Sequence, residues 1–115
     1  MPGQTRTERE ALSDLTEAAA GFALDGIWAL VAVLEHVARR WMTEFMEPGE
    51  QSVGARVTLT RVWPPLVAAV ITSTATLREV RGRRYVFDVE LRDERGDLIA
   101  SGSNERAVIA VPVAP

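Results

Sequence analysis

A carboxylate lies in the middle of a strongly apolar segment of this sequence. Glu35 is surrounded by leucine, valine, isoleucine and tryptophan residues between positions 23 and 46. Burial disfavours the charged form of a carboxyl group, which is the direction that a general base near neutral pH requires. Glu35 is therefore the first candidate for catalysis. In the simpler alternative, it lies at a helix edge and points to water or pairs with Arg39, four residues on.

Arg61 and His36 are further groups of a type that suits a site. Arg61 alternates with Val57 and Leu59 on a stretch with strand periodicity. An arginine stays protonated, so it can hold an oxyanion, a carboxylate or a phosphate but cannot act as a base. His36 is the one histidine. Neighbouring side chains on a helix point about 100° apart, so we expect His36 and Glu35 not to face one substrate from one subunit.

The residue types that are missing exclude several kinds of chemistry. The chain has no cysteine, which rules out disulfides, thiolate metal ligands and a cysteine nucleophile. One histidine without cysteine offers no metal-ligand spacing, and no glycine-rich phosphate loop follows a strand. We expect neither a metal ion nor a cofactor.

Charge and hydropathy limit the partners of the chain. The net charge of -3 comes from 13 basic and 16 acidic residues that are interspersed, so no basic field for nucleic acid is expected. The longest apolar stretch, residues 18–34, contains Asp25 and is shorter than the ~20 clean residues of a membrane span. The polar start of the chain differs from a secretory signal. These features predict a soluble cytoplasmic protein with no membrane or nucleic-acid partner.

The first part of the chain has helical patterns. Its 115 residues suit a single domain. Thr7 followed by Glu10 fits a helix-capping box and predicts a helix within an N-terminal extension, residues 1–20. Residues 21–47 predict a central helix that is apolar around much of its circumference and therefore buried on several sides. Pro48 and Gly49 predict the turn that ends it.

From about residue 53 the apolar period changes to that of strands. Four strands are predicted within 53–111, and the clearest has Tyr85, Phe87, Val89 and Leu91 on one face with charged residues on the other. Glycines and short polar turns make these strands antiparallel neighbours. The sequence thus predicts an α+β domain, a long helix across a curved antiparallel sheet. The hotdog fold and the cone-shaped fold of ketosteroid isomerase-like proteins both satisfy this pattern.

Three blocks of sequence favour the first of these folds. The blocks Glu47–Gly54, Ala75–Arg84 and Ser101–Ile109 resemble, in order and spacing, the sheet half of hotdog-fold acyl-CoA thioesterases, most closely the fluoroacetyl-CoA thioesterase group. The resemblance implies a homodimer or higher even oligomer that hydrolyses acyl-CoA thioesters between subunits. Relatives carry a strand before the central helix. Because that region here has a helical pattern, we expect the first strand to be missing or replaced by a helix.

The resemblance also implies roles for single residues. Glu35 matches the catalytic glutamate on the family's helix, and Gly54 matches a glycine where the backbone approaches the thioester. Arg106 matches an arginine near the active site, although it could instead form an ion pair on the sheet face with Glu105 or Asp88. We expect Gly54, Arg61 and Arg106 to bind substrate.

Two positions depart from the family pattern. Ile27 stands where relatives have a catalytic hydroxyl residue, and Arg61 stands where they have a catalytic histidine. The first hypothesis is an acyl-CoA thioesterase-like protein that hydrolyses or binds a short to modest acyl thioester, with Glu35 as base or nucleophile. The alternative is a non-catalytic hotdog module that binds acyl-CoA or serves in assembly. A second alternative is an isomerase or hydratase on a similar scaffold.

Overall fold

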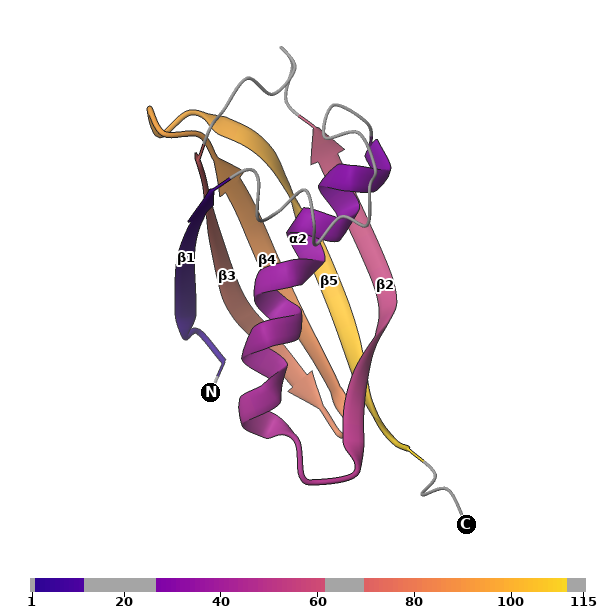
Figure 1. The fold of residues 1–115 in the computed structure, drawn as a ribbon. Coiled ribbons are helices and arrows are strands. Elements are labelled where there is room, and N and C mark those ends of the chain that lie inside the picture. The colour runs from indigo at the N-terminus through magenta and orange to yellow at the C-terminus, as the bar shows by residue number, and fades with distance from the viewer. Residues whose placement is uncertain (1, 12–26, 62–69, 112–115) are drawn as a thin grey trace.

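One helix lies across one face of a five-stranded antiparallel sheet. The computed structural model describes residues 2–11, 27–61 and 70–111, with the backbone alone at 11, 27–29 and 61. In chain order the elements are β1 (Thr5–Ala11), α2 (Ile27–Met42), the 3-10 helix η1 (Thr43–Phe45), β2 (Glu50–Arg61), β3 (Val70–Arg81), β4 (Arg84–Arg92) and β5 (Leu98–Ala110). The strand order is β1-β3-β4-β5-β2 (Figure 1). This arrangement confirms the α+β prediction.

Strand β1 corrects the prediction for the N-terminal region. It pairs antiparallel with β3, from Thr5 opposite Thr76 to Ala11 opposite Val70. Residues 5–11 are therefore not helical, and the expectation that the first strand is missing is wrong. A capping box offers a few local hydrogen bonds, whereas pairing with β3 satisfies a whole row of backbone groups. The rest of the predicted N-terminal helix, residues 12–20, lies outside the described part of the chain.

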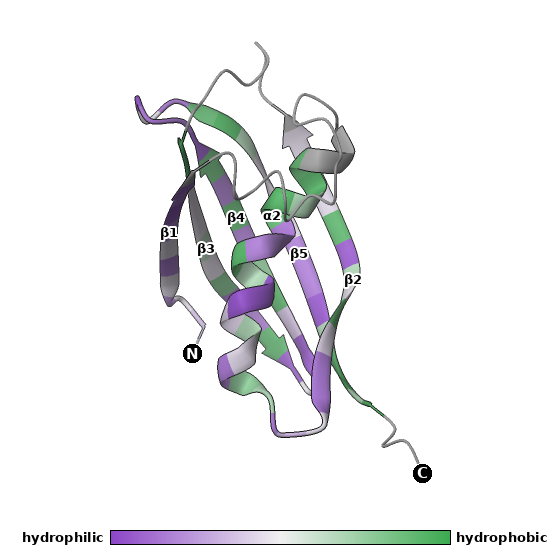
Figure 2. Ribbon diagram, viewed as in Figure 1, coloured by the Kyte–Doolittle hydropathy of each residue, from purple (hydrophilic) through white to green (hydrophobic). Residues whose placement is uncertain are grey.

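The sequence of β1 alternates in a way that suits its position at the sheet edge. Arg6, Glu8 and Glu10 are partly buried, while Thr5, Thr7 and Arg9 are exposed. Figure 2 shows β1 as largely hydrophilic, in contrast to the apolar bands along β4. The strand therefore presents charged rather than apolar groups to its surroundings.

Helix α2 is the buried centre of the fold, as its apolar pattern predicts. It ends at Met42, earlier than the predicted residue 47, and continues as η1, where Thr43 Oγ1 donates to the Arg40 carbonyl at 2.7 Å. The predicted helical residues 21–26 lie outside the described part. Seven helix residues are at most 3% exposed: Leu30, Val33, Leu34, Val37, Ala38, Trp41 and Met42. Among the described residues, no helix is long and apolar enough to cross a membrane.

The inner face of the sheet completes the core. Phe87, Val89 and Leu91 of β4 are at most 1% exposed, and the Trp41 ring packs on Phe87 with centroids 5.3 Å apart. Glycines with positive φ form the two hairpin turns, Gly82 at 60° and Gly96 at 85°. Strand β2 begins at residue 50, before the predicted start of the sheet at 53, and β1 gives the described sheet five strands instead of the predicted four. Residues 62–69, between β2 and β3, lie outside the description.

Helix and sheet approach closely over β5 and β2. A Cβ added at Gly102 of β5 would lie 1.9 Å from the Thr58 carbonyl oxygen and 3.0 Å from Leu34 Cδ1. Only a glycine fits this contact. Further along, the β2–β5 register shifts between Gly54 and Arg56. The candidate site lies beside this irregularity.

Candidate active site

Glu35 and Arg106 form an ion pair between α2 and the inner face of β5. Arg106 Nη1 donates to Glu35 Oε2 at 2.9 Å. The Arg106 side chain is 4% exposed and that of Glu35 is 27% exposed. A buried cation requires a partner, whereas a partly open carboxylate can still meet a ligand. The pair thus combines a fixed cation with an accessible anion.

All three nitrogens of the Arg106 guanidinium donate hydrogen bonds. Its Nε donates to Ser52 Oγ at 3.0 Å, its Nη2 to the Ser52 carbonyl at 3.3 Å, and its Nη1 also to Asn104 Oδ1 at 3.1 Å. Burial lowers the pKa of Arg106 below its ordinary value, and the charge of Glu35 opposes this shift. An arginine so close to a carboxylate stays a cation at any working pH.

Asn104 connects the ion pair to strand β2. The residue is fully buried, and its Nδ2 donates to the Arg56 carbonyl at 3.3 Å and to Glu35 Oε2 at 3.5 Å. The Glu35 carboxylate therefore receives donors from two neighbouring positions on β5.

Gly54 leaves the space that the carboxylate occupies. It lies opposite Arg106 in the β2–β5 register. A Cβ at this position would lie 2.6 Å from Glu35 Oε2. Any larger residue here must displace the carboxylate, so the glycine sets how closely Glu35 approaches the β2 backbone.

Glu35 and Arg106 open into a small pocket. The pocket has a volume of about 220 Å³ and is lined by Ala32, Glu35, His36, Arg39 and Arg106. Both Glu35 and His36 line this pocket, and the expectation that they do not face one substrate stays a prediction. Their functional ends still diverge: the carboxylate faces Arg106, while His36 Nε2 lies 3.3 Å from Glu10 Oε1.

The structure decides between several of the predicted contacts. Arg106 does not pair with Glu105 or Asp88, which lie within 3.0 Å of Arg84 and 3.3 Å of Arg78. The partner of Glu35 is Arg106 rather than Arg39. Three of the four predicted site residues, Glu35, Gly54 and Arg106, thus meet at one place.

The two positions that depart from the family pattern lie at element ends. Ile27 is the first described residue of α2, and Arg61 is the last residue of β2, opposite Ala100. Their side chains lie outside the described part. Substrate binding by Arg61 therefore stays a prediction.

Sequence reasoning missed Ser52 and Asn104. A signal was present, because Ser52 is two residues from Gly54, and Asn104 is two residues from Arg106. On a strand this spacing puts each pair on the same face. The polar residues would have been assigned to the site once Gly54 and Arg106 were placed there.

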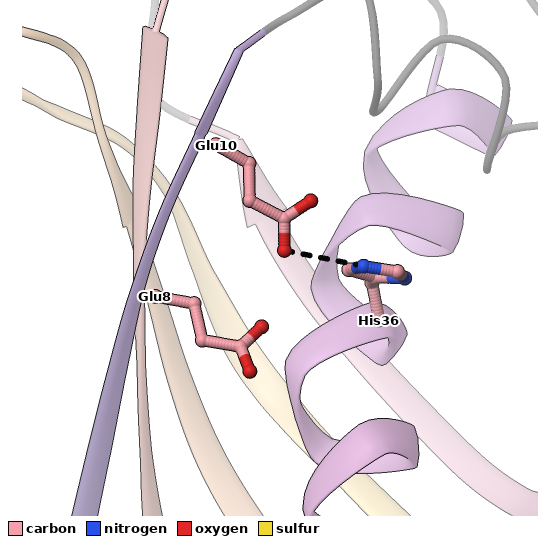
Figure 3. A group of neighbouring side chains, drawn as sticks. All are labelled: Glu8, Glu10 and His36. Atoms are coloured by element: carbon pink, nitrogen blue, oxygen red, sulfur yellow. Dashed lines mark ion pairs between the residues drawn. The ribbon is translucent and has the colours of Figure 1, made fainter.

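A second polar group lies between β1 and α2. Glu8, Glu10 and His36 offer ligand atoms that all lie within 4.8 Å of one another. Figure 3 shows the two carboxylates extending from β1 toward the imidazole on α2. Carboxylate and imidazole groups at such distances are potential metal ligands. However, Arg40 Nη1 lies 3.0 Å from Glu10 Oε1 and 3.5 Å from Glu8 Oε2. Because this guanidinium already forms ion pairs with both carboxylates, we assign the group to strand docking rather than to metal binding.

The chain is similar to known proteins over much of its length. The sequence profile of a family described as fluoroacetyl-CoA-specific thioesterase matches residues 16–111. A fluoroacetyl-CoA thioesterase from Streptantibioticus cattleyicolor is 39% identical over 80 residues, which cover 70% of this chain and 57% of that protein. The match thus spans little more than half of the relative's length.

Solved structures show the same fold. A structure of the fluoroacetyl-CoA thioesterase FlK superimposes with a TM-score of 0.74 at 31% identity, covering 96% of this chain and 89% of that chain. A thioesterase superfamily member from Thermus thermophilus gives a TM-score of 0.75 at 21% identity, covering 96% and 84%. A hot-dog-like protein from Thermanaerovibrio acidaminovorans gives 0.74 at 24% identity, covering 95% and 83%. The predicted hotdog fold is confirmed.

Proposed function

The chain belongs to the fluoroacetyl-CoA-specific thioesterase family, and from this premise we propose that it hydrolyses a short to modest acyl-CoA thioester. The observation that carries the proposal is the Glu35 carboxylate, held by the buried Arg106 and placed against Gly54 at a small pocket. Glu35 acts as the general base, or as the nucleophile, in this proposal. Gly54, Arg61 and Arg106 bind or position the substrate.

Hydrolysis of a thioester needs an attacking oxygen and donors for the oxygen that becomes negative. Arg106 stabilises the charge of the Glu35 carboxylate before the attack. Glu35 then takes the proton of the water as its oxygen bonds to the thioester carbon, and this proton passes to the CoA thiolate when the C–S bond breaks. Backbone N–H groups near Gly54 serve as donors to the oxyanion. Since the resemblance implies a hydroxyl residue and a histidine where this chain has Ile27 and Arg61, we expect slow turnover.

The size of the pocket supports a small acyl group. Its volume of about 220 Å³ leaves room for a few heavy atoms beside the carboxylate. A structure of a mutant form of FlK, 30% identical to this chain, is a complex with fluoroacetate and CoA. We therefore include a two-carbon acyl-CoA among the substrates to be tested first.

We further propose that the protein acts as a homodimer in the cytoplasm. An edge strand presents unpaired backbone groups, and a 115-residue domain gains buried surface when two such edges pair. CoA thioesters as substrates and a chain without cysteine suit a reducing compartment.

A non-catalytic acyl-CoA-binding module is the second candidate, and the residues at positions 27 and 61 favour it. Purified protein should be screened against a panel of acyl-CoAs while free thiol release and thermal shift are followed together. Thiol release supports hydrolysis. A thermal shift without release supports the binding module.

The Glu35→Gln variant tests the role of the carboxylate. General base catalysis is worth about 10² to 10⁴-fold, so kcat should fall by about that factor while substrate binding stays nearly intact. Glu47→Gln, an exposed change beyond the helix, is the matched control and should keep the wild-type rate. Equal rates in wild type and Glu35→Gln would remove Glu35 from the mechanism.

A further inference from the structure

A fully buried amide stands at a core position of β5. The neighbours of Asn104 on the inner face include Ala100, which is 0% exposed, and Val108, which is 8% exposed. An apolar side chain would fill such a position without desolvation cost, whereas an amide is tolerated only where its polar atoms are satisfied. A buried asparagine therefore needs polar partners. The partners found here belong to the candidate site or to the adjoining part of β2.

The amide of Asn104 contacts three elements at once. Its Oδ1 accepts from Arg106 Nη1 at 3.1 Å, on the same strand. Its Nδ2 donates to the Arg56 carbonyl of β2 at 3.3 Å and to Glu35 Oε2 of α2 at 3.5 Å. Arg56 directly follows the register shift that begins at Gly54. One side chain thus links the helix carboxylate to the irregular part of β2.

From these contacts we propose that Asn104 is a positioning residue, which fixes the Glu35 carboxylate relative to the Gly54 backbone. The inference deepens the function proposed above and depends on it for its kinetic consequences. Asn104 is fully buried and does not line the pocket, so it acts through Glu35 and not on the substrate. Displacement of a reacting group by about 1 Å can cost about 10²-fold in rate, which makes such positioning important.

Aspartate is the most informative replacement because it has nearly the same shape. Asn104→Asp keeps an acceptor for Arg106 but places an oxygen where the amide donates to Glu35. Two carboxylates that share a site oppose each other's ionisation. We expect the acid limb of the kcat/KM pH profile to move upward by about one pH unit. At neutral pH, kcat should fall about 10- to 100-fold, with KM within about twofold of wild type.

Ser103→Ala is the matched control. Ser103 is the neighbouring residue on β5, and its Oγ lies 2.7 Å from Thr58 Oγ1, away from the Glu35 site. This variant loses a side-chain hydrogen bond between the same two strands. It should keep the wild-type pH profile. A change of the pH profile in Asn104→Asp alone would then report the position of Glu35 and not a weaker pairing of the two strands.

A second measurement keeps the test independent of turnover. The side-chain carboxyl carbon of Glu35 can be followed by NMR during a pH titration, and its midpoint should move upward in Asn104→Asp. If no acyl-CoA is hydrolysed by the wild type, the proposed function fails, while the titration still decides on Asn104. An unchanged midpoint together with an unchanged pH profile would overturn the positioning role.

Asn104→Ser covers the case in which the aspartate variant does not fold. Serine is neutral and too short to reach Glu35, so we expect a lower kcat, or a broadened Glu35 carboxyl signal, without the upward movement of the pH profile. Wild-type kcat and an unchanged Glu35 signal in this variant would contradict the proposal.

Discussion

Single residues at the site are constrained by a charge pair that is largely removed from water. Arg106 is 3% exposed, and within the described part of the chain its guanidinium donates hydrogen bonds to Glu35, Ser52 and Asn104. Removing one partner of a buried pair leaves the other charge uncompensated, which costs more than the pair itself contributes. Replacement of Arg106 would therefore disturb folding and catalysis together. A sharper test of the site displaces the carboxylate and leaves the cation in place.

Gly54→Ala is such a change. The added Cβ would lie 2.6 Å from Glu35 Oε2, the far end of a flexible side chain, so the carboxylate has to move. We expect kcat/KM to fall at least about tenfold, with a melting temperature close to that of wild type. Steady-state kinetics and thermal unfolding of the same preparation measure both effects.

Gly102→Ala provides the contrast for this prediction. Here the Cβ would meet the Thr58 carbonyl oxygen at 1.9 Å, and backbone cannot yield as a side-chain end does. This variant should lose stability rather than activity alone.

A Gly54→Ala enzyme with the wild-type rate would show that catalysis does not need the observed position of Glu35.

The site was predictable from sequence only in part. Glu35 was suggested by a carboxylate within an apolar helix, and Gly54 and Arg106 by their resemblance to family positions. The partner of Arg106 was not predictable, because the pair joins residues 71 positions apart in the chain. Local spacing favours partners such as Arg39 or Glu105, and only the packing of α2 on β5 removes these alternatives.

At the scale of elements, ion pairs join β1 to α2. Glu8 and Glu10 project from one side of β1 toward His36 and Arg40 of the helix. Glu10, together with Thr7, forms the capping-box pattern that predicts a helix. Strand periodicity was present as well, in the alternation of exposed and partly buried residues. The edge of β3, with which residues 5–11 pair, decides in favour of a strand over a helix. The sequence of residues 5–11 alone does not reveal that edge.

The central elements were easier to predict. Helix α2 and strand β4 bury their apolar residues on the two sides of one core. Burial itself produces the apolar circumference of the helix and the alternation of the strand, so these sequence patterns predict the elements directly. Leu30 and Leu34 are both 0% exposed, as expected for a buried central helix. The predicted ends of the elements were less accurate, because turns and the 3-10 helix that begins at Thr43 depend on a few local hydrogen bonds.

The charge cluster on β1 predicts a pH dependence of stability. The pKa of Glu8 is raised from its ordinary value of 4.5, chiefly because burial disfavours the charged carboxylate, while Arg40 opposes this effect. Below pH 4.5 the Glu8 carboxyl group is protonated in both states, and its contribution to the stability of the folded protein is complete. This contribution is lost as the pH rises through the raised pKa of Glu8 in the folded protein. Glu8→Gln removes the penalty, so the melting temperature should exceed that of wild type at pH 7.5 and match it at pH 4.

Glu50→Gln is the control of opposite sign. The pKa of Glu50 is lowered by a hydrogen bond from the Glu47 backbone N–H and by Arg83. Its stabilising contribution is present above pH 4.5 and is lost as the pH falls through the folded value. Glu50→Gln should therefore melt below wild type at pH 7.5. Equal melting curves for wild type and Glu8→Gln at both pH values would show that burial of Glu8 carries no penalty.

At the scale of the whole molecule, β2 forms one border of the sheet described here, next to β5. Apolar side chains are exposed near this border: Val53 is 38% exposed, Ile109 40% and Val111 39%. Val53 pairs with Ala107 and Gln51 with Ile109, so Val53 and Ile109 are diagonal neighbours on adjacent strands. An edge strand with apolar neighbours is a suitable surface for pairing with a second copy.

Homodimerisation through this border leads to the last prediction. Light scattering of the wild type at micromolar concentration should give a particle of about twice the chain mass of 12.6 kDa. Lysine at a sheet edge opposes pairing, so the double variant Val53→Lys with Ile109→Lys should shift the mass toward that of the monomer. Gln4→Lys, an exposed change before β1 at the opposite border, should leave the dimer intact. Because the family resemblance implies a site between subunits, hydrolysis should fall with the dimer fraction on dilution. A wild-type particle of 12.6 kDa with full activity would contradict both the dimer and a site shared between subunits.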